Sequence, residues 1–387
     1  MKSASVLIVG GGIVGASIAW HLAERGWRDV AIVDRAGGPG GGSTGRTEGG
    51  FRTLFTSAPR VKLSLLSREK LLRFRDETGS DPGYEPVGYL WVAGGDEELQ
   101  VLREALRVQR AAGALDAREL SADEVSRLNP ALAPDGIAGG LLAPADGFIQ
   151  PMAMLGGYLS AAERRGVRVL WGTELQSFRR DGMRRITSAV TSAGTMRVGA
   201  VVNAAGPWAG PLADKAGVAL PVLPLRRQAF GAPAEARLPA GMPVTVYAAD
   251  GFQVRSRGGQ VLVQRPSPGI RGRPWDCSVD PEWLKEVAEL ARQRVPALAE
   301  TSFSMENAWG GLHEISPDHH VILGAATECP NFYLANGASG HGVTHAPAMG
   351  QLLAELMSDG ETPALDLTPF RLSRFSEGRP NPPPGLA

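Results

Sequence analysis

The fold is decided near the N-terminus by the stretch VLIVGGGIVGASIAWHLAERG, residues 6–26. Its first four residues form a short apolar run of the kind found in a buried parallel strand. The run ends in glycines, and Gly10, Gly12 and Gly15 fill the pattern G-x-G-x-x-G. Apolar residues then recur at helical spacing as far as Leu22, and a glycine follows them at a suitable distance for a helix end. The stretch therefore predicts a strand, a tight turn and a helix.

A second apolar run, residues 30–33, completes a βαβ unit and is followed by Asp34. In dinucleotide-binding units an acidic residue about 20 positions beyond the last glycine accepts hydrogen bonds from ribose hydroxyls. The glycines let a pyrophosphate approach the backbone, and the helix N-terminus offers unpaired N–H groups to its charge. The unit predicts an unphosphorylated adenosine dinucleotide, either FAD or NAD. The expected contacts are Gly10, Gly12, Ile13, Val14, Gly15, Asp34 and Arg35.

The composition limits the class of protein. Forty basic and 40 acidic residues balance one another across the 387-residue chain, which argues against a nucleic-acid or anionic-membrane partner. Two cysteines make no disulfide framework, so reduced thiols are expected. No stretch approaches the roughly 20 apolar residues of a membrane span, and no secretory signal is visible. We therefore expect a cytoplasmic protein of one large domain or two interleaved ones.

The segment after the second strand favours FAD over NAD. Residues 40–46, GGGSTGR, are small or hydroxylic, and no third strand follows directly. The next strands of the nucleotide sheet are expected only at 166–171 and 200–208, after a large insertion of roughly residues 36–150. Interleaving of this kind fits a two-domain flavoprotein better than a contiguous NAD domain.

At this point the sequence resembles the FAD-dependent amine oxidoreductases of the D-amino-acid oxidase superfamily. It looks closest to the branch of glycine/sarcosine oxidase, sarcosine oxidase β-subunit and dimethylglycine dehydrogenase. The resemblance runs from about Val6 to Met357. Besides the opening stretch it rests on GGSTGRTEGGFRTLF, DGFIQP (146–151), VVNAAGPWA, PLRRQAF (224–230), WGGLHEISPDHHVILG and GASGHGVTHAPAMGQLLAEL.

The expected architecture is α/β, with a Rossmann-like FAD-binding domain interleaved with a substrate domain built on a largely antiparallel sheet. In the substrate domain we expect residues 86–139 to form a helical insertion, and we expect the closing NPPPGLA to be mobile. The expected boundaries are 1–85, 140–220 and 310–365 for the FAD domain, 86–139 and 221–309 for the substrate domain, and 366–387 for a C-terminal tail.

The resemblance implies oxidation of the C–N bond of a secondary or D-amino acid that is sarcosine-, proline- or opine-like. Hydride transfer to flavin N5 would give an imine that water hydrolyses. Charge that develops on the pyrimidine edge of the flavin needs donors. GASGHG (337–342), between a strand at 331–335 and a helix at 343–357, would supply backbone N–H groups and a helix end. The remaining expected cofactor contacts are Ser43, Thr44, Arg46, Ala205, Gly206, Trp208, Gly337, Gly340, His341, Gly342, Val343 and Thr344.

The expected catalytic residues are Arg52, His341 and Thr344. Arg52 matches a family arginine that helps to hold the substrate carboxylate, a role that suits a bidentate guanidinium. The alternative is an ordinary position on a solvated face. Thr344 is expected to face the substrate, and His341 to lie near the flavin. We assign no catalytic base.

The chain departs from its resembling relatives in two respects. Monomeric sarcosine oxidases carry a carboxylate-binding lysine directly after the GHG element and an oxygen-activating lysine in the substrate domain. Here Val343 follows GHG, and residues 258–265 contain no lysine. These differences favour a dehydrogenase, with an oxygen-using glycine or D-amino-acid oxidase as the alternative. Positions of covalent linkage fall near Gly310 or Gly311 and near Arg46, so non-covalent FAD is expected.

Five of the six histidines lie between residues 313 and 345, which raises the question of a metal. His341 and His345 are four residues apart, but His341 is expected in the glycine turn, before the helix. His319 and His320 would point to opposite faces of a strand. We therefore expect no metal. His345, His313, His320 and Glu314 remain open between roles in the pocket and satisfied polar positions.

Two other classes of function stay open from the sequence. One is the amine-oxidising subunit of a hetero-oligomer or of an RNA-modification assembly, although the balanced charge argues against RNA. The other is a non-catalytic FAD-binding relic. A small-molecule amine or amino acid is the expected partner, and an oligomer or an electron-accepting protein is compatible with it.

Overall fold

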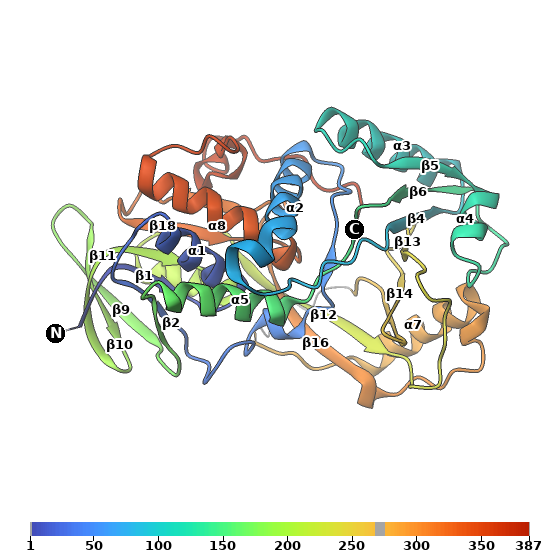
Figure 1. The fold of residues 1–387 in the computed structure, drawn as a ribbon, viewed down its shortest axis with the longest axis horizontal. Coiled ribbons are helices and arrows are strands. Elements are labelled where there is room, and N and C mark those ends of the chain that lie inside the picture. Colours follow the sequence, from blue (N-terminus) through green and yellow to red (C-terminus); the bar gives the residue numbers. More distant parts are fainter. Residues whose placement is uncertain (1, 268–274, 387) are drawn as a thin grey trace.

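The structure is a computed structural model that describes residues 2–267 and 275–386. Two large sheets lie toward opposite ends of the long axis of the molecule, and the long strands β12 and β16 extend between them (Figure 1). A small two-stranded sheet and helix α2 occupy the junction. Within the described residues no helix has the length and apolar character that a membrane span requires.

The first sheet has the predicted βαβ unit at its centre. Its main strand order is β17-β18-β11-β1-β2-β8, with the hairpin β9–β10 attached to β11. The strands β18, β11, β1, β2 and β8 run parallel, whereas β17 is antiparallel to β18. Their bounds are β1 Lys2–Val9, β2 Val30–Val33, β8 Arg168–Leu170, β9 Leu175–Arg180, β10 Ile186–Thr191, β11 Gly194–Asn203, β17 Ile322–Ala325 and β18 Phe332–Asn336.

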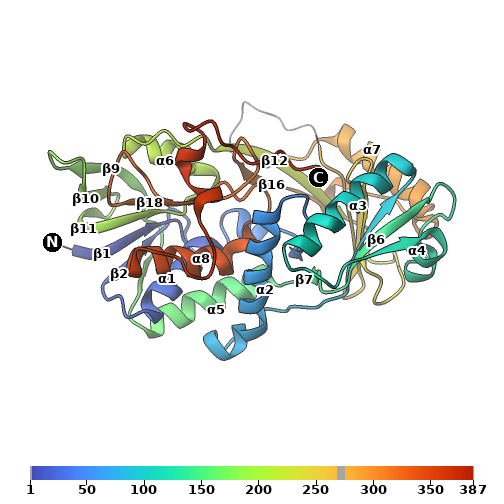
Figure 2. The same ribbon diagram turned by 90° about the horizontal axis from the view of Figure 1, so that it is seen from above.

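Helices cover both faces of this sheet, which explains why its central strands are continuously apolar. Along β1, Val6 and Ile8 belong to one buried cluster and Leu7 to another, because successive side chains point to opposite faces. Figure 2 shows α1, α5 and α8 on one side and α6 on the other. The bounds are α1 Ile13–Glu24, α5 Pro151–Arg164, α6 Ala209–Lys215 and α8 Gly342–Asp359.

The second sheet is antiparallel except where β13 runs parallel to β4. Its order is β16-β12-β15-β14-β13-β4-β6-β5. The strand bounds are β4 Tyr89–Ala93, β5 Arg118–Ser121, β6 Gly139–Ala143, β12 Leu223–Gly231, β13 Val244–Tyr247, β14 Gln253–Arg257, β15 Gln260–Gln264 and β16 Ala308–Ile315. The helices are α3 Asp96–Ala111, α4 Ala122–Leu128 and α7 Pro281–Arg294.

The prediction of a helical insertion at 86–139 is right only in part. This segment contains β4 and β5 as well as α3 and α4, and β6 begins at its end. All five residues of β4 are buried, so the strand lacks the alternation that would have revealed it. A Cβ at Gly140 would lie 2.5 Å from the Trp91 carbonyl oxygen, which explains why a glycine stands in so tight a strand pair. The domain limits stay a proposal. Strands β6 and β16 both belong to the second sheet, although they extend beyond the residue limits expected for the substrate domain.

The junction is built from short elements. The small sheet pairs β3 (Gly50–Phe51) with β7 (Gly147–Phe148), and α2 covers Ala58–Thr78. Across the described residues as a whole, the 3-10 helices are η1 Ser43–Arg46, η2 Gly206–Trp208, η3 Pro296–Leu298, η4 Met305–Asn307, η5 Thr368–Phe370 and η6 Leu372–Arg374.

The C-terminal tail differs from the expectation of a mobile end. Leu386 is buried in a cluster with Leu54 and Trp91, and the Gly385 N–H donates to Thr56 Oγ1 at 2.8 Å. Residues 385 and 386 thus pack at the junction between the two sheets.

Candidate active site

A cavity of about 680 Å³ opens at the carboxyl ends of β1, β2 and β11. In sheets of this topology ligands bind at that edge. Gly15, Gly337, His341 and Thr344 do not line the cavity. The predicted cofactor residues that do line it are Gly10, Gly12, Ile13, Val14, Asp34, Arg35, Ser43, Thr44, Arg46, Ala205, Gly206, Trp208, Gly340, Gly342 and Val343.

The glycine turn after β1 shapes one end of the cavity. Gly10 has a φ of +115°, and a Cβ there would lie 2.2 Å from the Ala204 carbonyl oxygen. A Cβ at Gly15 would lie 1.9 Å from the Gly10 carbonyl oxygen. Gly15 therefore lets α1 pack on the turn without facing the ligand, which is the usual task of the third glycine.

Asp34 stands at the end of β2, beside this turn. Its Oδ2 accepts a hydrogen bond from the Gly11 N–H at 2.7 Å, and its Oδ1 accepts one from the Ala36 N–H at 2.8 Å. A carboxylate has about four acceptor positions, so two remain for the hydroxyls of a ribose. The residue fits the role predicted for it.

Helix η1 forms a wall of the cavity between the two large sheets. Thr44 Oγ1 accepts from the Ile13 N–H at 3.1 Å, at the start of α1. Ser43 Oγ donates to the Leu312 carbonyl at 2.6 Å, and Arg46 Nη1 to the Gly310 carbonyl at 3.2 Å. These bonds attach the small-residue segment to α1 on one side and to β16 on the other.

Trp208 and Arg35 line the nucleotide end of the cavity. The Arg35 guanidinium carbon lies 4.0 Å above the Trp208 ring, which stacks on Trp275 with 5.0 Å between ring centroids. Trp208 Nε1 is buried and has no partner among the described residues. A buried donor on the cavity wall calls for an acceptor on a ligand, and a dinucleotide carries many such oxygens.

The predicted flavin turn joins β18 to α8. Gly340 has a φ of +91°, and a Cβ there would lie 2.7 Å from His313 Nδ1. The backbone at Gly340 and Gly342 lines the cavity, but the His341 side chain points elsewhere. The expected contact between His341 and the cofactor stays a prediction; in this structure the glycines on either side of it line the cavity.

His341 lies between two arginines. The Arg52 Nε donates to His341 Nε2 at 3.1 Å, and Arg52 Nη2 lies 2.7 Å from the same atom. Arg60 Nη2, from the first turn of α2, lies 2.9 Å from His341 Nδ1. This places Arg52 beside the flavin turn and adds Arg60, which the sequence analysis missed.

Burial controls the ionisation of this cluster. Burial lowers the pKa of Arg52 to about 10 and, together with the charge of Arg52, lowers that of Arg60 to about 9. It also lowers the pKa of His341 well below its usual value, and both arginines lower it further. Phe55 packs against both guanidiniums, with Arg60 Cζ 4.0 Å from the ring centroid. The site therefore holds two cations and a neutral imidazole near pH 7.

Thr344 makes a structural contact, and its expected place on the substrate side stays a prediction. Its hydroxyl donates to the Gly50 carbonyl at 3.1 Å and ties α8 to β3. Another link holds the segment that carries Arg52: Asp146 Oδ1 accepts from the Thr53 N–H and from the Thr53 hydroxyl, both at 2.8 Å. Asp146 begins the DGFIQP motif, and burial raises its pKa to about 7.

The remaining histidines have separate surroundings. His319 and His320 lie in a turn after β16, so their expected placement on a strand is wrong; the preceding Ser316-Pro317-Asp318 explains the turn. His320 Nε2 contacts Ser57 Oγ at 2.6 Å, and His345 Nε2 contacts Ser64 Oγ at 3.1 Å. In the part of the chain that the structure describes, no three His, Cys, Asp or Glu residues are grouped as metal ligands would be.

Two polar residues of β16 face the cavity. Burial raises the pKa of Glu314 to about 7, and its Oε2 has no partner among the described residues. Burial lowers the pKa of His313 to about 4. Near neutral pH the cavity is therefore lined by an uncharged imidazole and by a carboxyl group that is about half protonated.

The family model described as DAO, FAD dependent oxidoreductase, matches residues 5–356. The chain belongs to this family. It is therefore an FAD-dependent enzyme that acts on CH–NH or CH–NH2 donors, and the cavity described above is its candidate FAD site. The glycine turn, Asp34 and the unpaired Trp208 Nε1 all fit that cofactor.

Individual relatives support the same assignment for this flavoprotein. The chain is 30% identical over 378 residues to glycine oxidase from Geobacillus kaustophilus, covering 95% of this chain and 96% of the relative. It is 26% identical to mitochondrial sarcosine dehydrogenase from Mus musculus, covering 97% of this chain and 42% of that protein. The structure of L-proline dehydrogenase from P. horikoshii matches with a TM-score of 0.90 at 26% identity, covering 98% of this chain and all of that one.

Proposed function

We propose that the enzyme oxidises the C–N bond of a secondary or D-amino acid that is sarcosine-, proline- or opine-like, and that the resulting imine is hydrolysed by water. The main support is the position of Arg52. Its guanidinium is held by His341, whose neighbours Gly340 and Gly342 line the FAD cavity. A carboxylate bound by Arg52 would therefore be fixed beside the cofactor turn.

The protein's own contribution is orientation and electrostatics. Arg52 would bind the substrate carboxylate through two charge-assisted hydrogen bonds and so fix the amine end. Non-covalent FAD, when bound, accepts the electrons removed from the C–N bond. Backbone N–H groups at Gly340 and Gly342 and the N-terminus of α8 would face developing negative charge. The buried surroundings of Arg52 and His341 would strengthen these interactions by excluding water.

We infer that the physiological electron acceptor is a protein or small molecule other than oxygen. The segment 258–265, which comprises the turn after β14 and strand β15, contains no lysine that could serve as the oxygen-activating cation of the resembling oxidases. A cytoplasmic location and an electron-accepting partner are part of the same proposal.

Steady-state turnover of the FAD-loaded enzyme tests both parts of the proposal. Sarcosine, L-proline, D-alanine and an opine would each be offered with an artificial electron acceptor and, separately, with air. We expect acceptor reduction with at least one of them and a much lower rate of hydrogen peroxide formation. Equal rates would assign an oxidase, and inactivity with the whole panel would contradict the proposed substrates.

A further inference from the structure

Among the described residues, the hydrogen-bond acceptor that Arg60 contacts is the His341 imidazole, which it shares with Arg52. A neutral imidazole has one acceptor nitrogen and one N–H group. His341 Nε2 receives the bond from Arg52, and His341 Nδ1 lies 3.2 Å from the Ser339 carbonyl, to which it can only donate. With the proton on Nδ1, the contact of 2.9 Å between Arg60 Nη2 and Nδ1 joins two donors; with the proton on Nε2, the contact from Arg52 does. One imidazole does not satisfy two guanidiniums.

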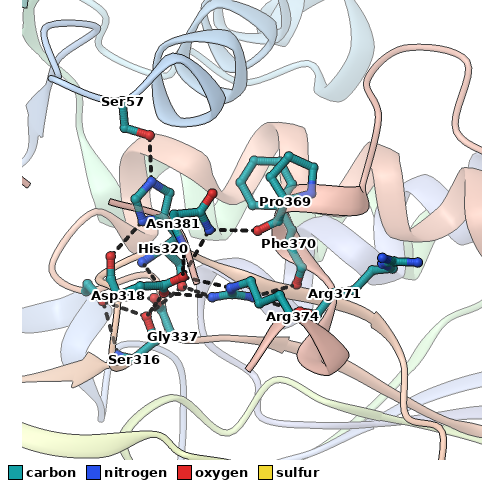
Figure 3. Close-up of polar contacts among 11 residues, drawn as sticks. Ser57, Ser316, Asp318, His320, Gly337, Pro369, Phe370, Arg371, Arg374 and Asn381 are labelled. Atoms are coloured by element: carbon teal, nitrogen blue, oxygen red, sulfur yellow. Dashed lines mark hydrogen bonds and ion pairs between the residues drawn. The ribbon is translucent and has the colours of Figure 1, made fainter. Parts of the chain in front are cut away.

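The charge of Arg60 is also left without a counter-charge. Arg60 is 4% exposed, and its contacts with described residues are to His341 and the Phe55 ring, with no ion pair among them. Asp318 is the acidic residue whose charge Arg60 feels. However, Arg374 Nε and Nη2 each lie 2.8 Å from Asp318 oxygens, and Asn381 donates twice more at 3.0 Å (Figure 3). That carboxylate is already neutralised.

The start of α2 adds to the positive potential around Arg60. Ser57 is the N-cap residue, yet its side chain caps no N–H group of the helix. Its hydroxyl instead contacts His320 Nε2 at 2.6 Å (Figure 3). A buried arginine at an uncapped helix N-terminus, next to a second buried arginine, favours an anion.

We propose that Arg60 is a second substrate-carboxylate site and that the preferred substrates are secondary amines that carry two carboxylates, the opine-like class. Arg52 binds one carboxylate and Arg60 the other, so both charges of the substrate are paired inside the protein. Arg60 thereby supplies from α2 the second cation that this chain lacks after its GHG element. This inference rests on the proposed function, because it places the amine between two carboxylates at the same site.

An inert pair of ligands tests the inference without turnover. Oxydiacetate and methoxyacetate replace the amine of iminodiacetate and of sarcosine by an ether oxygen, so neither has a C–N bond to oxidise. Binding to the FAD-loaded protein would be measured by isothermal titration for wild type, Arg60→Gln and Arg60→Lys. Arg73→Gln, an exposed position on the same helix, is the matched control. Flavin content and thermal unfolding would verify that each variant is folded.

We expect wild type to bind oxydiacetate at least about tenfold more tightly than methoxyacetate, since a buried charge-assisted pair is worth this much or more. Arg60→Gln should reduce the preference to within about twofold, Arg60→Lys should keep part of it, and Arg73→Gln should leave it unchanged. Equal affinity of wild type for both ligands, or an unchanged preference in Arg60→Gln, would overturn the inference. If the inference fails in this way but the enzyme still oxidises sarcosine or proline, the proposed function holds without the second carboxylate site.

Discussion

At the scale of single residues, the sequence identifies Arg52 through its motif but does not identify Arg60. The motif places Arg52 two residues after Gly50, the first residue of β3, and the resemblance supplies its role. Arg60 meets His341 across 281 positions of sequence, and nothing near it marks it out among 40 basic residues. The turn of His341 away from the cavity was equally unpredictable, because it depends on where Arg52 and Arg60 lie.

The first residue-scale prediction concerns Arg52→Ala. We expect the KM for sarcosine to rise roughly 10- to 100-fold, because a hydrogen bond to a charged group contributes about 1.5–3 kcal/mol. The KM for N-methylethylamine, which lacks the carboxylate, should change little. Steady-state kinetics of both substrates measure the difference, and Arg75→Ala, at an exposed position of α2, serves as the control. Equal effects on the two substrates would show that Arg52 is not the carboxylate anchor.

At the scale of elements, periodicity and turn chemistry predict the nucleotide unit well and the insertion poorly. The first βαβ unit combines a strand, a glycine turn and an acid at fixed spacing, so local sequence suffices. Residues 86–139 were expected to be helical, yet β4 is apolar at every position and pairs with β13 from far along the chain. Strand pairing over such distances depends on tertiary contacts that a window of sequence does not contain.

Asp146 provides a test of how the elements at the junction are held. Asp146→Ala would leave the Thr53 N–H and hydroxyl without their acceptor in a fully buried position. We expect the free energy of unfolding to fall by about 3 kcal/mol and the KM for sarcosine to rise because Arg52 is adjacent. Urea titration and steady-state kinetics measure the two effects.

Asp116→Ala is the matched control for Asp146→Ala, since Asp116 forms an exposed ion pair with Arg68. Its loss should lower the free energy of unfolding by less than about 1 kcal/mol. A loss in Asp146→Ala no larger than in this control would reject its role in holding the Arg52 segment.

At the scale of the whole molecule, the C-terminal tail is connected to the junction by the buried network of Figure 3. Arg374 is 2% exposed and pairs with Asp318, and Asn381 extends the network to the last residues of the chain. Sequence analysis placed residues 366–387 outside the two domains, as a C-terminal tail. The ion-pair partner of Arg374, Asp318, lies in the turn after β16, 56 positions away in the sequence.

Arg374→Met should destabilise the fold because it leaves the Asp318 carboxylate buried without its cation. Breaking one side of a buried pair costs about 3–5 kcal/mol, and urea titration at pH 7 measures this loss. Arg371 is half-exposed and lies 3.4 Å from Glu377, so Arg371→Met serves as the control. It should lower the free energy of unfolding by less than about 1 kcal/mol.

The same pair predicts a dependence on pH. Burial alone would raise the pKa of Asp318, but hydrogen bonds and charge from Arg374 and bonds from Asn381 hold it below its usual range. The stabilisation is therefore present above the unfolded-state pKa of about 3.9 and is lost as the pH falls below it. The difference between wild type and Arg374→Met should shrink below about pH 4. A difference that stays constant from pH 7 to pH 3 would contradict this account of the network.

The most direct test of the central claim is anaerobic reduction of the bound flavin. The FAD-loaded enzyme would be mixed without oxygen with sarcosine, L-proline, iminodiacetate and N-methylethylamine, and its visible absorption followed in time. The account predicts bleaching by the carboxylate-bearing amines, at lower concentrations than by N-methylethylamine. A flavin that stays oxidised with every carboxylate-bearing amine, or that N-methylethylamine bleaches as readily as the others, would contradict an amino-acid site built on Arg52 beside the cofactor.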